Sequence, residues 1–364
     1  MKTSKVYLFT CALLAGVLPQ SADEGLSIED ICSRPGFECL ESEAGTVIGK
    51  AGATASYAHS IDEAAAAFER YFGKKAPKAA LVLGEVRDAE VRTNLLRLFP
   101  VVLPWMTLDD RRAMVERSVR AQVQASRPDL KDEALEKVVA QSVEASLNAR
   151  GRQDDDLHHG ILAHELGHMF FMRSYYPDQN ANLLQAGDGP PALPSEYGSP
   201  APDWMDEMSA VLLENAVLTE SRYGRMTGIK TQNDFTQIWS FEEYLTMGHP
   251  ALAEARKVME ARRQSADAGG MGGVVILNQS DMAPPEEGPA PVMFYSQSRA
   301  FADYMIETTG NVQIFAEVAA AITQGKTVNE WLDLKGEELG LPSTIDALEK
   351  GFQQWFIARE RSGR

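Results

Sequence analysis

Hydrophobic residues recur along this chain in two patterns, one typical of helices and one typical of strands. Short apolar runs at residues 79–83 and 101–103 have the length and composition of buried strands. Helical spacing predicts helices over residues 60–73, ending at Gly73, over residues 108–149 with a break at Pro128, and in about four short segments after residue 292. This distribution predicts an α+β fold that is mostly helical and contains a small sheet.

Two stretches interrupt these patterns with proline and glycine. Residues 174–202 contain six prolines, and residues 266–291 contain a glycine cluster followed by a proline-rich end. Both predict irregular connections. Long ordered loops in compact domains are often functional.

The composition restricts the possible partners. The chain has 364 residues and a formal net charge of −17. An acidic surface repels the phosphates of nucleic acids and the head groups of anionic membranes. We therefore expect neither nucleic acid nor an anionic membrane surface as a partner.

Residues 1–22 have the layout of a secretory signal peptide. Lys2 and Lys5 precede an apolar run over residues 6–18, and polar residues follow. The apolar run is too short to span a bilayer. These features predict export to the periplasm or the medium, with cleavage near Ala22 and no membrane attachment afterwards.

Two cysteines remain after removal of that segment. Cys32 and Cys39 flank a Pro-Gly turn within the N-terminal segment, residues 23–59. A pair of cysteines in an exported chain predicts a disulfide, and two free thiols are the alternative.

The most specific chemical signal is the sequence His164-Glu165-Leu166-Gly167-His168, inside an apolar helical run. Residues four apart share a helix face, so both imidazoles can reach one Zn²⁺ at about 2.0–2.1 Å. Glu165 is rotated by about 100° from His164 and lies beside the metal, where a general base is needed. The alternative, two histidines that share a face by chance, would bury unpaired imidazoles at a cost. Gly167 predicts close packing of another segment or of substrate.

Catalytic zinc requires a third protein ligand. The metzincin pattern would place a histidine at position 174, but this residue is Ser174, so the ligand must come from further along the chain. Residues 202–213 predict a helix that Asp203 caps, with an inward stripe of Trp204, Met208 and Val211. Glu207 lies on this stripe and is the predicted third ligand, because a buried carboxylate needs a metal or a partner.

Other acidic residues nearby are weaker candidates for the third ligand. Asp206 and Glu214 are rotated off the inward stripe. A buried ion pair, or a partly exposed position, is the alternative for Glu207 itself.

A second acidic and histidine-rich group precedes the motif. The sequence Asp154-Asp155-Asp156-Leu157-His158-His159 could be a second metal site. Acidic residues favour the positive end of the helix dipole, and His158 lies on a different face from His164. We predict a solvated helix start.

The metal motif and the later Trp204-Met205-Asp206-Glu207-Met208-Ser209-Ala210 resemble the gluzincin (peptidase MA-like) pattern, HExxH followed by W-x-x-E-x-x-A. The run over residues 294–305 resembles the helical segment of these domains and, more distantly, that of a zinc aminopeptidase family. The resemblance implies a zinc peptidase in which Tyr295 hydrogen-bonds the tetrahedral intermediate. Packing of Tyr295 against Phe301 is the alternative.

The resemblance also implies a two-lobed zincin fold. Residues 60–173 would form an N-terminal lobe with the sheet and the zinc helix, and residues 174–364 a helical lobe with the third ligand. The chain departs from the family pattern at residues 108–150 and 251–292. It lacks a GxMEN-type exopeptidase motif, so aminopeptidase activity is not implied.

These observations predict hydrolysis of peptide bonds in a peptide or protein substrate by metal-activated water. A non-catalytic exported binding or envelope-assembly protein that retains the zincin fold is the alternative. Hydrolysis of a non-peptide amide by zinc is a third possibility.

Overall fold

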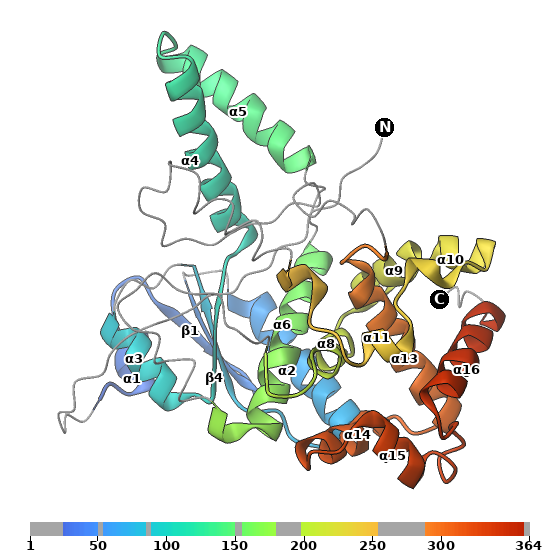
Figure 1. The fold of residues 1–364 in the computed structure, drawn as a ribbon. Helices are drawn as coiled ribbons and strands as arrows, with labels where there is room; N and C mark the ends of the chain where they lie inside the picture. Colours follow the sequence, from blue (N-terminus) through green and yellow to red (C-terminus); the bar gives the residue numbers. More distant parts are fainter. Residues whose placement is uncertain are drawn as a thin grey trace.

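The computed structural model describes residues 25–49, 54–84, 89–149, 155–179, 198–253 and 288–359. Over these ranges the chain is mostly helical with a small mixed sheet, which confirms the α+β prediction (Figure 1). The predicted signal peptide, the glycine cluster at 269–273 and most of the connection over 174–202 lie outside the described residues. Among the described helices, none has the length and apolar character needed to cross a membrane.

Four short strands form the sheet in the order β1-β2-β3-β4. They are β1 (Glu38–Glu41), β2 (Gly45–Gly49), β3 (Ala79–Leu83) and β4 (Val101–Trp105). Strand β1 is antiparallel to β2, whereas β2, β3 and β4 are parallel to one another. Leu81 pairs with Val47 on one side and with Leu103 on the other. The two apolar runs predicted as strands are β3 and β4.

Helices cover both faces of the sheet. The covering helices are α1 (Ile28–Cys32), α2 (Thr54–Phe72), α3 (Ala89–Leu98) and α6 (Asp155–Tyr175). Alternate strand residues point to opposite faces, so Ile48 and Val82 pack in the core beneath α1 and α3. Leu81 and Leu83 belong to the large core on the other face, which contains α2 and α6. Burial on both faces explains why β3 is apolar throughout.

Helix α2 begins earlier than the sequence pattern predicted. We expected a start at residue 60, but the helix begins at Thr54. The buried stripe continues through Tyr57 and Ala58, and this tertiary burial extends the helix beyond the predicted start. Its end was predicted correctly, because Gly73 adopts φ = +62°, a conformation that favours glycine.

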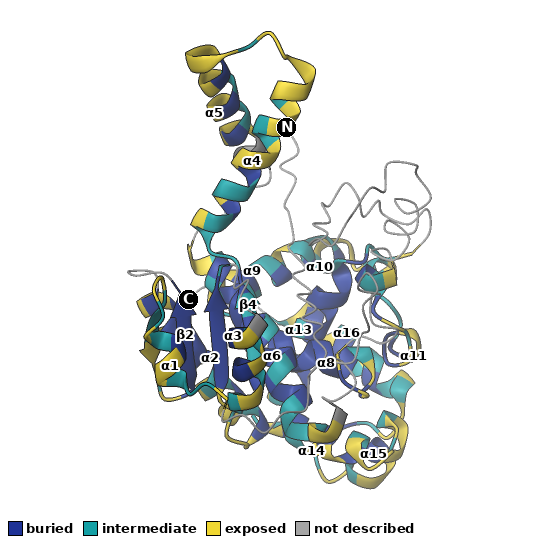
Figure 2. Ribbon diagram, turned by 90° about the vertical axis from the view of Figure 1, so that its left-hand side faces the viewer, coloured by how far each residue is buried: buried dark blue, intermediate teal, exposed yellow. Residues whose placement is uncertain are grey.

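A helical hairpin projects from the body of the molecule between β4 and α6 (Figures 1 and 2). It consists of α4 (Leu108–Ser126) and α5 (Asp132–Ala149), which flank the predicted break at Pro128. A capping box between Thr107 and Asp110 fixes the start of α4. The two helices share a small cluster of their own, with Val115 and Val139 buried at its centre.

Short helices make up the rest of the described chain. They are α8 (Asp203–Val211), α9 (Ala216–Arg225), α10 (Thr227–Gln232), α11 (Phe241–Tyr244), α13 (Met293–Thr309), α14 (Ile314–Thr323), α15 (Val328–Lys335) and α16 (Ile345–Ala358), with 3₁₀ turns η1 (Pro177–Gln179) and η2 (Phe235–Gln237). The segment after residue 292 thus forms helices α13 to α16, as predicted. At the other end of the chain, Cys32 and Cys39 form a disulfide.

Candidate metal centre

The backbones of helices α6 and α8 lie in close contact at Gly167. A Cβ added to Gly167 would lie 2.7 Å from the Cα of Ala210 and 2.7 Å from the carbonyl oxygen of Ser209. Close-packed interiors cannot accommodate such contacts, so only glycine allows the two backbones to touch here. This confirms the close packing that the sequence predicted at Gly167, and the packing segment is α8.

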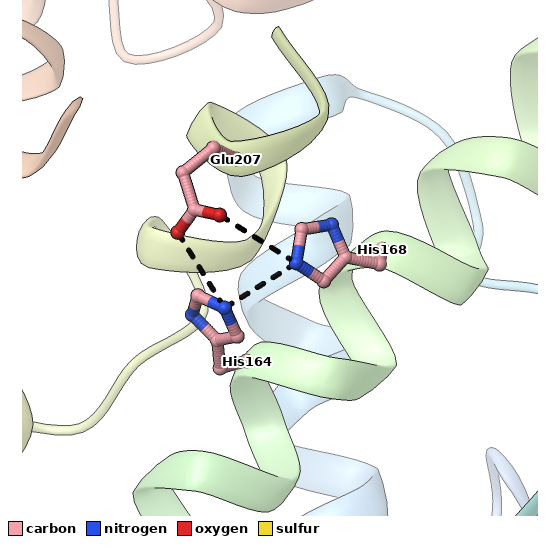
Figure 3. A group of neighbouring side chains, drawn as sticks. All are labelled: His164, His168 and Glu207. Atoms are coloured by element: carbon pink, nitrogen blue, oxygen red, sulfur yellow. Dashed lines mark hydrogen bonds and ion pairs between the residues drawn. The ribbon is translucent and has the colours of Figure 1, made fainter. Parts of the chain in front are cut away.

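The contact brings three potential metal ligands together. His164 and His168 on α6 and Glu207 on α8 point toward a common centre (Figure 3). One donor atom of each side chain lies within 4.8 Å of the other two, and all three residues are buried. The predicted ligand set is therefore assembled in space.

The distances between these atoms match those of a tetrahedral metal site. Nε2 of His164 lies 3.3 Å from Nε2 of His168 and 3.5 Å from Oε1 of Glu207. Nε2 of His168 lies 3.8 Å from Oε2 of Glu207. Donors held tetrahedrally at about 2.0–2.1 Å from one zinc ion are about 3.4 Å apart. A cation would need only small side-chain adjustments to bind all three.

A buried ion pair orients the first histidine. Nδ1 of His164 lies 2.8 Å from Oε1 of Glu214. Glu214 in turn accepts hydrogen bonds from Arg222, at 3.1 Å from Nε to Oε2 and 2.5 Å from Nη2 to Oε1. A carboxylate bound to Nδ1–H fixes the tautomer and leaves the Nε2 lone pair for a metal. Glu214 is thus a partner of the ligand His164 and lies outside the group of three donors.

The second histidine also faces α8. The backbone of Asp206, the residue that precedes Glu207, favours the protonated ring of His168 and so raises its pKa, against the larger effect of burial. Nε2 of His168 lies near Nε2 of His164 and Oε2 of Glu207. Both imidazoles therefore direct their Nε2 atoms toward the same centre.

The charges of the centre suit a bound cation. Burial alone would raise the pKa of Glu207, but His164, the hydrogen bond from His249 and His168 lower it to about 2. Burial and the neighbouring His164 lower the pKa of His168 to about 3. Burial opposes protonation of His164, but Glu207 and Glu214 raise its pKa. The two carboxylates thus favour a positive charge on His164.

The residues present therefore fit a metal ion. Oε1 of Glu207 is fully buried and accepts no hydrogen bond from the described residues. An orphaned carboxylate oxygen is costly to bury unless it meets a cation. Two imidazoles and one carboxylate are also a common donor set of catalytic zinc sites. These side chains thus form a candidate metal centre.

Glu165 differs from the ligands in its exposure. It is partly exposed, whereas His164 and His168 on either side are buried. Desolvation raises the pKa of Glu165 to about 7, with His164 opposing and Glu207 reinforcing this shift. A carboxyl group whose pKa is near neutrality can both accept and return a proton.

His249 contributes a contact that the sequence did not predict. Its side chain is fully buried, and its Nε2 lies 3.3 Å from Oε2 of Glu207. A single histidine 42 residues after Glu207 has no motif spacing that could have indicated this contact. Only the folded chain brings the two residues together.

Tyr295 lies beside the centre, near the start of α13. Its ring centroid is 5.9 Å from that of His164 and 5.3 Å from that of His249. The guanidinium carbon of Arg222 lies 4.7 Å from the centre of the Tyr295 ring. The structure therefore places the predicted catalytic tyrosine next to a predicted ligand.

Two acidic residues of α8 have roles other than those expected. Asp203 was predicted to cap the helix, but it is the first helical residue, and its Oδ2 accepts a hydrogen bond from the backbone N–H of His249 at 2.5 Å. The capping prediction was wrong because Pro202 occupies the cap position. Asp206 is buried and accepts hydrogen bonds from the backbone and hydroxyl groups of Ser199.

The acidic and histidine-rich group before the motif forms the beginning of α6. Asp155 and Asp156 lie in its first turn, as predicted. His158, however, is buried rather than solvated, and its Nε2 accepts a hydrogen bond of 2.8 Å from Nε1–H of Trp105 on β4. His159 Nδ1 lies 2.8 Å from Oγ of Ser60 on α2. These histidines join α6 to the sheet and to α2.

Comparison of the chain with protein-family models, with curated proteins and with solved structures found no match. The geometry of His164, His168 and Glu207 therefore supports the metal centre on its own.

Proposed function

We propose that this protein is a zinc-dependent metallopeptidase of the gluzincin type, with the two-lobed zincin fold. The observation that carries the proposal is the buried group of His164, His168 and Glu207, whose donor atoms lie within 4.8 Å of one another. The partly exposed Glu165 beside this group, with a pKa of about 7, supports a catalytic site.

His164, His168 and Glu207 would hold the metal. A zinc ion bound there supplies Lewis acidity and lowers the pKa of its water toward 7. The protein would contribute two imidazoles and one carboxylate, and Glu214 orients the ring of His164. Three protein ligands are the usual number in a catalytic zinc site.

Glu165 is the general base in this proposal. It accepts a proton from the attacking water and later donates it to the amine nitrogen of the leaving group. A carboxyl group with a pKa of about 7 can perform both transfers near neutral pH. Its partial exposure allows water to reach it.

Tyr295 is the proposed donor to the oxyanion that develops on the scissile carbonyl. Its ring lies beside His164, and Arg222 lies over the ring. A nearby cation favours the negative charge that develops in this region. The substrate is a peptide or protein, and the predicted signal peptide would deliver the enzyme to the periplasm or the medium.

The decisive experiment is Glu165→Gln with two readouts, zinc content and cleavage of an unbiased peptide library. The amide keeps the shape of the side chain but cannot act as a base. We expect zinc content to be retained and cleavage to fall by at least about 100-fold. Glu220→Gln on α9 is the matched control, because Glu220 is exposed and undergoes the same loss of charge.

Unchanged cleavage by Glu165→Gln would remove Glu165 from the mechanism. Zinc binding without cleavage of any peptide by the wild-type protein would favour the non-catalytic alternative.

A further inference from the structure

His249 is held at the first turn of α8 by two contacts. Its backbone N–H donates to Oδ2 of Asp203 at 2.5 Å, and its Nε2 lies 3.3 Å from Oε2 of Glu207. Its ring packs against Phe294 at 5.0 Å and Tyr295 at 5.3 Å between ring centroids. These contacts thus fix both the backbone and the side chain of His249.

The geometry does not make His249 a ligand. The donor atoms that lie mutually within 4.8 Å belong to His164, His168 and Glu207, and His249 is not a member of this group. Two donors bound to one zinc ion at about 2.0–2.1 Å can be at most about 4.2 Å apart. His249 therefore contacts the third ligand without sharing the centre.

The two oxygens of Glu207 have different surroundings. Oε2 lies 3.3 Å from Nε2 of His249 and 3.8 Å from Nε2 of His168. Oε1 accepts no hydrogen bond from the described residues and lies 3.5 Å from Nε2 of His164. A carboxylate can bind a metal through either oxygen or through both. A donor placed on Oε2 restricts this choice and directs Oε1 toward His164.

We propose that His249 is a positioning residue that donates its Nε2–H to Oε2 of Glu207 and so directs Oε1 to the metal. The inference rests on the proposed function only in requiring a metal at this centre, and it does not depend on catalysis. It explains why a histidine is buried against a residue that the sequence marks as a ligand.

Two variants of His249 separate hydrogen bonding from packing. Leucine is close to histidine in volume but cannot donate, whereas the amide nitrogen of glutamine can reach the position of Nε2. We expect His249→Leu to weaken Zn²⁺ binding by about 10- to 100-fold in competition with a chromophoric chelator. We expect His249→Gln to recover most of that loss.

His158→Leu is the matched control, because it replaces another buried histidine that contacts Trp105 and none of the ligands. We expect this variant to be less stable but to bind Zn²⁺ within about twofold of the wild-type protein. Circular dichroism of the metal-free proteins shows which variants fold. If His249→Leu does not fold, two other measurements test the proposal. They are the zinc affinity of His249→Gln relative to the wild-type protein, and X-ray absorption of the zinc-loaded wild-type protein.

The outcomes distinguish this proposal from the proposed function. X-ray absorption should show two imidazole ligands, and three would make His249 a ligand and overturn its positioning role. Two results for zinc affinity would also overturn the positioning role. One is an affinity of His249→Leu equal to that of the wild-type protein. The other is an affinity of His249→Gln more than about 100-fold weaker than that of the wild-type protein. A wild-type protein that binds no metal would overturn both proposals, whereas normal metal binding without peptide cleavage would overturn the proposed function alone.

Discussion

Gly167 on α6 and Ala210 on α8 are in backbone contact, with only 2.7 Å between the Cα of Ala210 and the position that a Cβ on Gly167 would occupy. This contact sets the separation of the two helices that carry the proposed ligands. The metal centre therefore depends on a residue that has no side chain.

Substitution of Gly167 by alanine should push α6 and α8 apart. We expect Gly167→Ala to lower the free energy of unfolding by about 1–3 kcal/mol, although the gain in helix propensity offsets about 1 kcal/mol of the steric strain. Zinc affinity should fall as well, because His164 and Glu207 separate. Urea unfolding of the metal-free protein and a zinc titration measure the two effects.

Gly224 on α9 provides the control for that substitution. A Cβ added there meets no atom within 4 Å, so Gly224→Ala should stabilise the protein by up to about 1 kcal/mol and leave zinc affinity unchanged. Equal behaviour of the two alanine variants would show that the α6–α8 contact does not govern the site.

The sequence predicted the centre of this site well because its determinants are local. His164, Glu165 and His168 lie on one helical turn, and Glu207 lies on an apolar stripe, so helix periodicity alone orients them. Gly167 between the two histidines also signalled the packing against α8. The predicted start of α2 was less accurate, because tertiary burial of Tyr57 and Ala58 extends that helix toward its N-terminus.

The residues that support the ligands could not be found in the same way. Glu214 was considered only as a ligand, and its pairing with His164 depends on the turn between α8 and α9. Arg222 and His249 come from separate elements and have no fixed spacing from the motif. The strands β1 and β2 were also missed, since they are short and are stabilised by pairing within the sheet.

Loss of the Glu214 charge should weaken metal binding. Glu214→Gln keeps an oxygen near Nδ1 of His164 but leaves the buried Arg222 without its anion. We expect zinc affinity to fall by about 10- to 100-fold and the free energy of unfolding to fall by about 3–5 kcal/mol. Chelator competition and urea unfolding provide the measurements.

A second substitution separates the two roles of Glu214. In Glu214→Gln with Arg222→Met, the uncompensated cation is removed, so part of the stability should return while zinc affinity stays low. Recovery of full affinity in the double variant would mean that Glu214 acts only on the stability of the fold.

His158 should make the stability of the protein sensitive to acid. Burial, reinforced by His159 and Arg111, lowers its pKa from 6.5 to about 4. The native state therefore favours the neutral ring. The contribution of His158 to the free energy of unfolding is fully present above pH 6.5 and is lost as the pH falls toward 4. Two and a half pH units correspond to about 3 kcal/mol.

Substitution of His158 by glutamine isolates this contribution, because the amide oxygen can still accept the hydrogen bond from Trp105. The drop in unfolding free energy between pH 7 and pH 4 should be smaller in His158→Gln than in the wild-type protein by up to about 3 kcal/mol. Parallel pH profiles for the two proteins would contradict the assignment.

Removal of the metal should destabilise the native state. A ligand at a thousandfold excess over its dissociation constant stabilises the protein by about 4 kcal/mol. We therefore expect chelation to lower the midpoint of thermal unfolding and added zinc to restore it. Glu207→Gln should show little response to either treatment, and a wild-type midpoint that is indifferent to zinc would argue against binding at this centre.

Metal analysis of the purified wild-type protein, incubated with one equivalent of Zn²⁺ and then desalted, shows whether the centre binds a metal. Because His164, His168 and Glu207 form a single centre, we predict about one zinc ion per chain. If the folded wild-type protein retains no zinc or other transition metal, these three side chains do not form a metal centre.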